Sequence, residues 1–438
     1  MKERLRQWWE QTRASLWFLP TLMMVAAAVL ALFGVPLELR ADWAAGEAQG
    51  WLHRGSGRSA SDLISSLLTS MITMTAVVIS ITMVVLTLAQ TQLGPRLIRN
   101  FLGDLKTQAM LGVFMATIVH LLLVLPQIDD QMTAEQVPHV SVTLGIAGTL
   151  LSVGMLLIFT HHLARSMVTE VMIDRVGREL DHAAERLLPK RQDADGEAEA
   201  RVDGQPGTLT LTLAGYVQAI DRQQLADTAE RAGASIRLDF HAGQHLLPGA
   251  TRVRVFPASA ATPQLQRAVE AAVITGTERT PPQDLEFGIT QLVQIAMRAL
   301  SPGINDPFTA MSVVDRLAIS LAAILQRGAA PARYRDRGGN VRLELPAIAI
   351  DELTDAAFNQ IRQASAEHAD VLIRLLSAIC GLMTVATDGS QRRALLRHAD
   401  LIRNQAQRSL PEAADREDVE RHHARVRRLS SEPDSSET

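Results

Sequence analysis

Long uncharged apolar segments crowd the first 165 residues, whereas shorter amphipathic patterns fill the remainder. The apolar segments predict four membrane helices, over about residues 16–37, 63–90, 109–125 and 140–160. The second is the most distinctive, because at about 1.5 Å per residue it spans roughly 42 Å, more than the roughly 30 Å hydrocarbon core of a bilayer. We therefore expect a helix that crosses the membrane and protrudes from it.

Hydroxyl side chains recur along this second segment. A seven-residue spacing places Ser66, Thr73, Ser80 and Thr87 on one slowly drifting helical stripe, and Thr69, Thr75 and Thr82 widen it. Hydroxyl groups along an axis can line a passive, water-filled pore. They can equally hydrogen-bond to their own helix backbone, or pack against other helices of the bundle. The stripe is thus a candidate pore lining with two structural alternatives.

Basic residues indicate the orientation of the membrane helices. They occur before the first apolar segment, after the second and after the fourth, whereas the loop 127–139 is acidic. By the positive-inside rule, both chain termini are then cytoplasmic. Gln90, Arg96 and Arg99 follow the hydroxyl stripe and are candidates for its cytoplasmic end.

The predicted spans contain no Asp, Glu, Lys or Arg, and His120 is the only ionisable residue well inside one. Coupled transporters generally carry such groups at membrane depth, so this pattern argues against coupled transport. Gly145, Gly148 and Gly154 in the fourth span predict close packing with another helix. Four spans can hardly enclose a pore within one chain, so a channel requires a homo-oligomer.

The remaining residues predict a helical extension and linker over 166–207, a small β-rich module over 208–260, a helical domain over 261–429 and a disordered tail over 430–438. Expected strands cover 208–213, 216–220, 235–240, 251–256 and 341–345, and expected helices cover 223–232, 263–275, 284–300, 307–326, 351–387, 390–409 and 411–429. The last helix is highly charged, and with His422 and His423 it predicts a solvated or oligomer-contacting surface. The fold class is therefore a mainly α membrane protein with a cytoplasmic α+β domain.

The segment AGYVQAID, with the glycine-containing turn and RVRVF that follow, resembles the barrel-sandwich fold of biotinyl and lipoyl carrier domains. Such carriers hold their prosthetic group on a lysine, and no lysine follows Lys190. The resemblance therefore implies a structural module without a cofactor.

The most distinctive soluble motif is DLEFGITQLVQIAMRALSPGINDPFTAMSVVDRL, over residues 284–317. Asp306 can cap the helix that follows, and Pro307 suits its first position because the missing N–H needs no partner there. The alternative is that Ser301, Asn305 and Asp306 line a ligand, ion or subunit contact.

This motif, together with QTQLGPRLIRNF after the second span and AGYVQAID, resembles a bacterial family of predicted membrane proteins catalogued as domain of unknown function 2254. The resemblance covers nearly the whole chain. It implies an inner-membrane helical region followed by a cytoplasmic domain, and it implies no reaction.

Other function classes find little support in the sequence. No Walker, HExxH, GxSxG or GxGxxG motif is present, Cys380 is the single cysteine, and 43 basic residues balance 47 acidic ones. We expect no enzyme, metal site, cofactor or nucleic-acid partner. The leading hypothesis is a homo-oligomeric passive channel for ions or small solutes. The alternative is a non-conducting scaffold or sensor in the lipid bilayer, whose cytoplasmic domain binds a small ligand, ion or protein.

Overall fold

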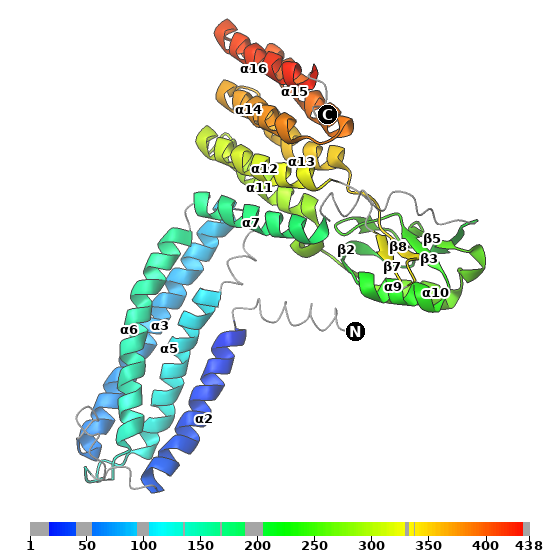
Figure 1. The fold of residues 1–438 in the computed structure, drawn as a ribbon. Coiled ribbons are helices and arrows are strands. Elements are labelled where there is room, and N and C mark those ends of the chain that lie inside the picture. Colours follow the sequence, from blue (N-terminus) through cyan, green and yellow to red (C-terminus); the bar gives the residue numbers. More distant parts are fainter. Residues whose placement is uncertain are drawn as a thin grey trace. The chain divides into compact units, whose positions relative to one another are not determined.

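The computed structural model describes residues 17–40, 55–93, 105–134, 136–166, 169–188, 205–328, 333–336 and 338–431 (Figure 1). The chain forms two compact units, Met1–Val168 and Thr169–Thr438. Most described residues are helical, and a smaller part of the second unit is β-sheet.

The first unit is built from long helices that lie side by side. The described helices are α2 (Phe18–Arg40), α3 (Gly57–Leu93), α5 (Leu105–Val124) and α6 (His139–Ser166), with a short 3-10 turn at Leu125–Gln127. Helix α5 contacts α2, α3 and α6. An apolar core that includes Ile64, Met71, Phe114 and Leu121 fills the space between the helices.

Glycines allow α5 to approach its neighbours closely. A Cβ atom added at Gly112 would lie 2.4 Å from the Met23 sulfur, and one added at Gly145 would lie 2.7 Å from Cδ2 of Leu121. Gly148 approaches Thr117 in the same way, whereas an added Cβ at Gly154 meets no described atom within 4 Å. Two of the three glycines expected to serve close packing in α6 therefore do so.

Helix α2 corrects one expectation from the sequence. It continues to Arg40, three residues beyond the predicted end, and so includes Glu38. The candidate span accordingly ends at Glu38, a carboxylate that the predicted boundaries placed outside the membrane helices. The helix extends this far because Glu38 finds hydrogen-bond donors on α6.

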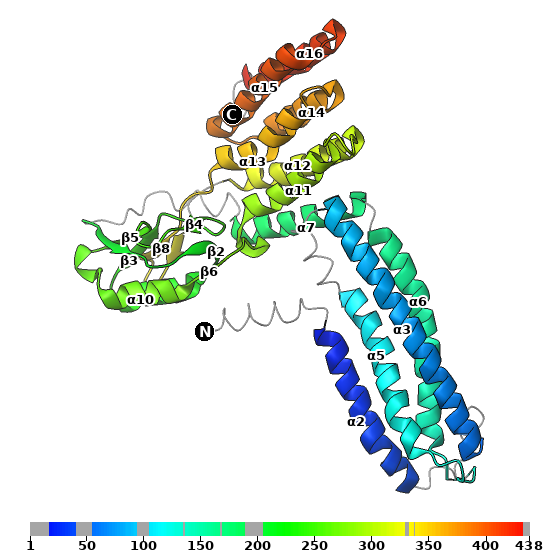
Figure 2. The ribbon, with the colours of Figure 1, turned by 180° about the vertical axis from the view of Figure 1, so that it is seen from behind.

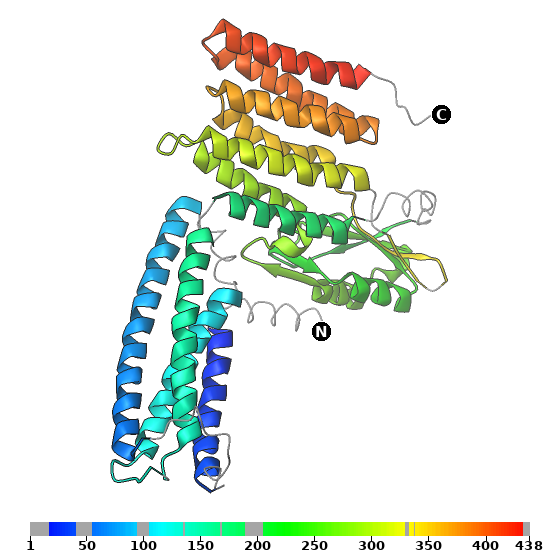
Figure 3. The ribbon, with the colours of Figure 1, turned by 60° about the vertical axis from the view of Figure 1, so that its left-hand side comes forward.

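The second unit contains a two-layer stack of helices. The stack comprises α7 (Thr169–Leu187), α11 (Leu285–Ala299), α12 (Pro307–Arg327), α13 (Ile350–Ala364), α14 (Ala369–Val385), α15 (Gly389–Ser409) and α16 (Ala413–Ser431). Helices α12, α14 and α16 form one layer, α11, α13 and α15 form the other, and α7 packs on both α11 and α12 (Figure 3). Each successive antiparallel pair packs on the pair before it, as in α-helical repeat proteins.

One helical prediction in this stack was wrong in detail. The single helix expected over 351–387 is two helices, because the chain turns at Ser365 and reverses at His368. No glycine or proline marks that turn. Most residues of the last helix are exposed or partly exposed, whereas His423 is 2% exposed and its Nε2 lies 2.7 Å from an Asp400 carboxylate oxygen.

The β-rich part of this unit holds two sheets and two helices, and Figure 2 shows α10 beside the strands. One sheet has the order β1-β5-β3-β8-β7 and the other β4-β2-β6; β3 and β8 pair in parallel, and every other pair is antiparallel. The strands are β1 (Gly207–Thr210), β2 (Gly215–Ile220), β3 (Ser235–Leu238), β4 (His245–Leu246), β5 (Arg252–Phe256), β6 (Val273–Gly276), β7 (Arg333–Arg335) and β8 (Val341–Glu344). Helices α9 (Arg222–Arg231) and α10 (Pro263–Ala272) contribute to their common apolar core.

This module differs from the β-rich module expected over 208–260. It also includes α10 and β6, and it takes β7 and β8 from beyond α12, more than 50 residues later in the chain. The expected helix 263–275 ends at Ala272 because Val273 begins β6, which pairs with β2. An arrangement with two core helices and a parallel strand pair departs from the expected barrel-sandwich.

Five described helices are long and apolar enough to cross a membrane. Four of these segments belong to the first unit: Phe18–Glu38, Gly57–Thr87, Leu105–Gln127 and His139–His161. The fifth is α12, where Arg316 is 8% exposed and forms an ion pair with Asp181 of α7. Half of the apolar segment of α12 is buried, and the helix packs against α7, α11 and α14 within the stack.

Candidate functional site

Helix α3 presents its apolar and hydroxyl stripes on opposite faces. Ile64, Met71, Val78 and Val85, spaced by seven residues, are at most 8% exposed and belong to the core of the first unit. The hydroxyl stripe begins two residues later, at Ser66, which corresponds to a rotation of about 200° around a helix. Five of the seven hydroxyl residues expected on the widened stripe are exposed: Ser66, Thr69, Thr73, Ser80 and Thr87. The other two, Thr75 and Thr82, are 4% and 6% exposed and lie on the buried face, so the expectation that they widen the stripe was wrong.

Most of these hydroxyl groups donate to the backbone of their own helix. The Ser66 hydroxyl donates to the Asp62 carbonyl at 2.8 Å, and Thr69, Thr73 and Thr87 bond in the same way to the carbonyl four residues before them, at 2.9–3.0 Å. Each of these hydroxyl protons thus has a hydrogen-bond acceptor within its own helix. Each oxygen keeps acceptor capacity for a donor outside the helix, such as water.

The exposure of the stripe distinguishes between its two structural alternatives, hydrogen bonding to the helix backbone and packing against other helices of the bundle. Because the five hydroxyl side chains are exposed within the first unit, they do not pack the helices of their own bundle. Self-bonding to the backbone is observed for four of them. Of the residues expected at the cytoplasmic end, Gln90 lies within α3, and Arg96 and Arg99 lie outside the described residues.

Other polar groups of the first unit are buried between α5 and α6. The Thr117 hydroxyl, which donates to the Val113 carbonyl, lies 3.4 Å from the Ser152 hydroxyl, and Ser152 is fully buried. His120 is 6% exposed, and its Nε2 lies 3.0 Å from the Ser141 carbonyl oxygen, to which it donates. Thus His120 joins α5 to α6.

Glu38 extends this polar contact to α2. Its carboxylate accepts hydrogen bonds from the Ser141 backbone N–H at 3.1 Å and from the Ser141 hydroxyl at 2.9 Å, and it also accepts from the Val140 N–H. These donors belong to the first turn of α6, where a carboxylate is favoured by the unpaired N–H groups and the helix dipole. Glu38, His120 and Ser141 line a cavity of about 130 Å³, with Leu30 and Leu144 among the apolar lining.

The soluble motif forms the turn between α11 and α12. Asp306 is the N-cap of α12, because its carboxylate accepts from the Thr309 N–H at 3.1 Å and from the Thr309 hydroxyl at 2.6 Å. Hydrogen bonds from that hydroxyl and N–H lower the pKa of Asp306 below its usual value. Pro307 occupies the first helical turn, as the capping interpretation predicts.

The rest of the turn has no buried polar cluster. Ser301 donates its hydroxyl to the Arg298 carbonyl at 2.7 Å, and Asn305 is exposed with a left-handed backbone, φ 50°. The exposed side chains beside them are Ile304 and Phe308, which are apolar. The turn therefore resembles a shaped surface more than a polar ligand pocket.

Two buried charge clusters in the second unit escaped the sequence analysis. Arg279 donates to Asp284 at 2.6 and 2.7 Å, and Asp284 also caps α11 through the Phe287 N–H. Although burial opposes it, Asp284 raises the pKa of Arg279. Asp181 joins Arg316 and Ser320 across α7 and α12. No local spacing signals the second cluster, whose members lie far apart in the chain.

Comparisons with known proteins identify relatives. The family model described as "Predicted membrane protein (DUF2254)" matches residues 13–380. The chain is 28% identical over 373 residues to uncharacterized proteins of Mycobacterium bovis and of Mycobacterium tuberculosis, covering 83% of this chain and 71% of each relative. No solved structure matches the chain.

Proposed function

We propose that this chain, which belongs to the DUF2254 family of predicted membrane proteins, assembles into a homo-oligomeric passive channel for ions or small solutes. In this proposal α2, α3, α5 and α6 cross the bacterial inner membrane, and both termini are cytoplasmic. The unit Thr169–Thr438 acts as the cytoplasmic regulatory domain. Its partners are the lipid bilayer and further copies of the chain; a nucleic acid, a cofactor and an enzymatic reaction have no part in it.

One observation carries the proposal: the hydroxyl stripe of α3 is directed away from its own bundle. Ser66, Thr73 and Ser80 are exposed, while the apolar stripe of the same helix is buried among α5 and α6 neighbours. In a monomer this stripe would face hydrocarbon, where the oxygen atoms find no hydrogen-bond donor. Around the axis of an oligomer, α3 helices would direct the same oxygen atoms at water or at one another.

The absence of charge along the stripe suits passive conduction of hydrated solutes. The described part of α3 holds Asp62 and Arg58 near its first turns, and no Asp, Glu, Lys or Arg from Leu63 onward. A pore lined by neutral hydroxyl groups has weak binding sites, which a permeating particle can leave easily. Coupled transport requires ionisable groups at membrane depth, and the stripe supplies none.

Cysteine substitution tests the position of the stripe. In a Cys380→Ser background, we expect Ser66→Cys, Thr73→Cys and Ser80→Cys to form like-to-like disulfides and to react with water-soluble thiol reagents. Ile72→Cys and Ile79→Cys are matched controls, because these side chains are 52% and 39% exposed but point about 100° away from the neighbouring stripe position. Equal reactivity at the stripe and at the controls would contradict an α3-lined path.

Conduction itself is tested in a planar bilayer. Purified full-length protein should give discrete currents that thiol reagents block in the Thr73→Cys variant and leave unchanged in the Ile72→Cys variant. A silent bilayer across voltage, membrane tension and ionic conditions would overturn the channel proposal, even if the cross-links form.

The second candidate is a non-conducting scaffold or sensor, favoured by the helical stack of the second unit. Stacked helix pairs present extended surfaces that bind other proteins. Here the hydroxyl stripe would serve subunit packing, and the second unit would bind a protein, a small ligand or an ion near Asn305 and Asp306. Like-to-like cross-links without current and without access of water-soluble reagents would favour this candidate.

A further inference from the structure

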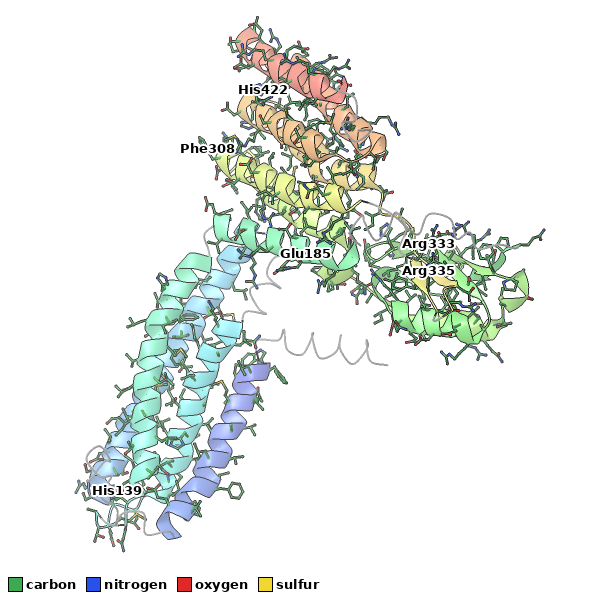
Figure 4. The ribbon with its side chains drawn as sticks, viewed as in Figure 1. His139, Glu185, Phe308, Arg333, Arg335 and His422 are labelled. Carbon is green, nitrogen blue, oxygen red and sulfur yellow. The ribbon has the colours of Figure 1, made fainter. Side chains whose placement is uncertain are left out.

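The turn between α11 and α12 exposes two large apolar side chains. Ile304 is 52% and Phe308 76% exposed, and Phe308 projects from the start of α12 (Figure 4). The left-handed backbone of Asn305 and the cap by Asp306 shape the turn between them. We call residues 304–308 the apolar tip. Channel formation through α3 gives this tip no role.

Side-chain contacts establish which end of the stack carries the tip. Asp181 of α7 contacts Arg316 and Ser320 of α12, and further along both helices the Leu188 carbonyl accepts a hydrogen bond from Arg327 at 3.2 Å. Residue numbers rise together in the two contacts, so α7 and α12 run parallel. The apolar tip therefore lies at the end of the stack where α7 begins.

The chain itself ties this end of the stack to the membrane. The candidate span in α6 ends at His161, α6 continues to Ser166, and α7 begins at Thr169. The five helical residues after His161 advance about 8 Å, and three Cα–Cα steps to Thr169 add at most about 11 Å. The first turn of α7 must therefore remain within about 20 Å of the end of the span, whatever the orientation of the stack.

At that end of the stack, large apolar side chains of the described residues are exposed only near the start of α7, which follows the α6–α7 connection. Helices α12 and α14 both start there, because Arg374 of α14 pairs with Asp315 of α12, and Thr387 lies beside Leu325 further along. Helix α16 starts there as well, because the hydroxyl of Ser409, the last residue of α15, donates to the Ala366 carbonyl in the turn before α14. Val171 in the first turn of α7 is 47% exposed, like its neighbours in the tip. In the described turns before α14 and α16 no large apolar side chain is exposed, and Leu410 is 4% exposed.

We propose that the apolar tip inserts into the interfacial layer of the lipid bilayer. A phenylalanine and an isoleucine at the end of a helical hairpin gain free energy by leaving water for that layer. The pairing of Asp306 with Thr309 keeps its carboxylate occupied within the turn. Insertion fixes the stack to the membrane at a second point besides the α6–α7 connection.

Depth-dependent quenching in nanodiscs tests this insertion with the full chain. Ile304→Cys in a Cys380→Ser background is labelled with an environment-sensitive fluorophore and placed in phosphatidylcholine nanodiscs that contain spin-labelled lipids. The matched control is Ile319→Cys, which is 60% exposed on the same helix, about three turns further from the tip. We expect severalfold stronger quenching at position 304 than at position 319.

Equal quenching at the two positions, or none at 304, would overturn the insertion. A second measurement keeps the result independent of the label: Phe308→Asp should increase the accessibility of the thiol at position 304 to a water-soluble reagent, whereas Ile319→Asp should leave it unchanged. Like-to-like disulfides at position 304 together with absent lipid quenching would also overturn it, because a second copy would then cover the tip. None of these readouts depends on conduction.

Discussion

The two compact units bury polar side chains in different ways. Between α5 and α6 the buried polar side chains include hydroxyl groups and an imidazole: Thr117 meets Ser152, and His120 meets a backbone carbonyl. In the second unit they include ion pairs, as in Arg316 with Asp181 and Arg279 with Asp284. The proposed topology accounts for the difference, because a chain inserted in lipid incurs the desolvation of a charge at insertion, whereas a chain folding in water can solvate it until its partner arrives.

Glu38 is the informative exception within the first unit. Its half-buried carboxylate is held by backbone N–H groups and a hydroxyl at the start of α6. A helix N-terminus thus replaces the basic side chain that a carboxylate finds in the second unit. The first unit thus brings its helices together at small residues, whereas the second unit buries charges in pairs, so that the loss of one member leaves the other uncompensated.

The largest expected effect is the loss of a buried charge partner in the second unit. We expect Asp284→Ala to lower the free energy of unfolding of that unit by about 3–5 kcal/mol, because it leaves Arg279 buried without its main partner and removes the cap of α11. Labelling of Cys380, a buried thiol in α14, at increasing urea concentration measures the unfolding.

Asp306→Ala is the matched control for this prediction. Asp306 caps α12 as Asp284 caps α11, but it accepts its hydrogen bonds from Thr309 and forms no ion pair in the described structure. A cap alone is worth about 1 kcal/mol. Equal losses in the two variants would show that the ion pair adds nothing, and would weaken the contrast between the units.

A smaller effect is expected from pH, again in the second unit. Burial and the neighbouring Arg397 lower the pKa of His398 to about 4, against the opposing effect of Asp355. Between pH 6.5 and 4, the unfolded chain binds a proton at His398 more readily than the folded chain does. The free energy of unfolding therefore falls as the pH falls. From pH 7 to pH 5 the loss attributable to His398 is on the order of 2 kcal/mol.

Urea unfolding followed by circular dichroism at several pH values measures this loss. His398→Gln cannot take up the proton, so its stability should change less between pH 7 and pH 5 than that of the parent protein. Identical pH profiles for the two proteins would show that the buried imidazole does not contribute.

An effect of similar size concerns side-chain volume in the first unit. Gly148→Leu should destabilise that unit by about 1–3 kcal/mol, because even a Cβ atom added at Gly148 would lie 3.0 Å from the Thr117 hydroxyl oxygen. Gly154→Leu, on the same helix but with open space around it, should be nearly neutral. All five tryptophans lie within residues 8–51, so their emission during thermal unfolding in detergent reports on this unit. Equal losses at both glycines would exclude close packing as the cause.

Sequence periodicity predicted the hydroxyl stripe of α3 but not the direction in which it faces. The buried residues Ile64, Met71 and Val78 share their seven-residue spacing and their apolar character with exposed residues such as Val77 and Val84. In a membrane, an apolar side chain is equally suitable for contact with lipid and with another helix. The sequence pattern therefore does not predict which face of α3 is buried in the bundle. The direction emerged only from the packing of α3 on α5 and α6.

The sequence predicted the structure correctly where the chemistry of a residue and its immediate neighbours determines it. The cap at Asp306 and the position of Pro307 followed from residue type alone. The turn at Ser365 was missed because neither glycine nor proline marks it, and strand β8 joined the sheet from more than 80 residues beyond β5. Pairings such as Asp181 with Arg316 depend on tertiary contact, which no spacing along the chain records.

The length of α3 makes bilayer thickness part of its energetics. Its candidate span has 31 residues, about 46 Å, whereas the other three spans of the first unit have 21 to 23 residues, about 32–35 Å. A bilayer that matches the shorter helices leaves α3 with a hydrophobic mismatch, which tilting or protrusion must absorb. Because the hydroxyl stripe runs along the same helix, the tilt of α3 also sets which hydroxyl groups lie at the midplane. Thinner and thicker membranes therefore place different parts of the stripe at the bilayer centre.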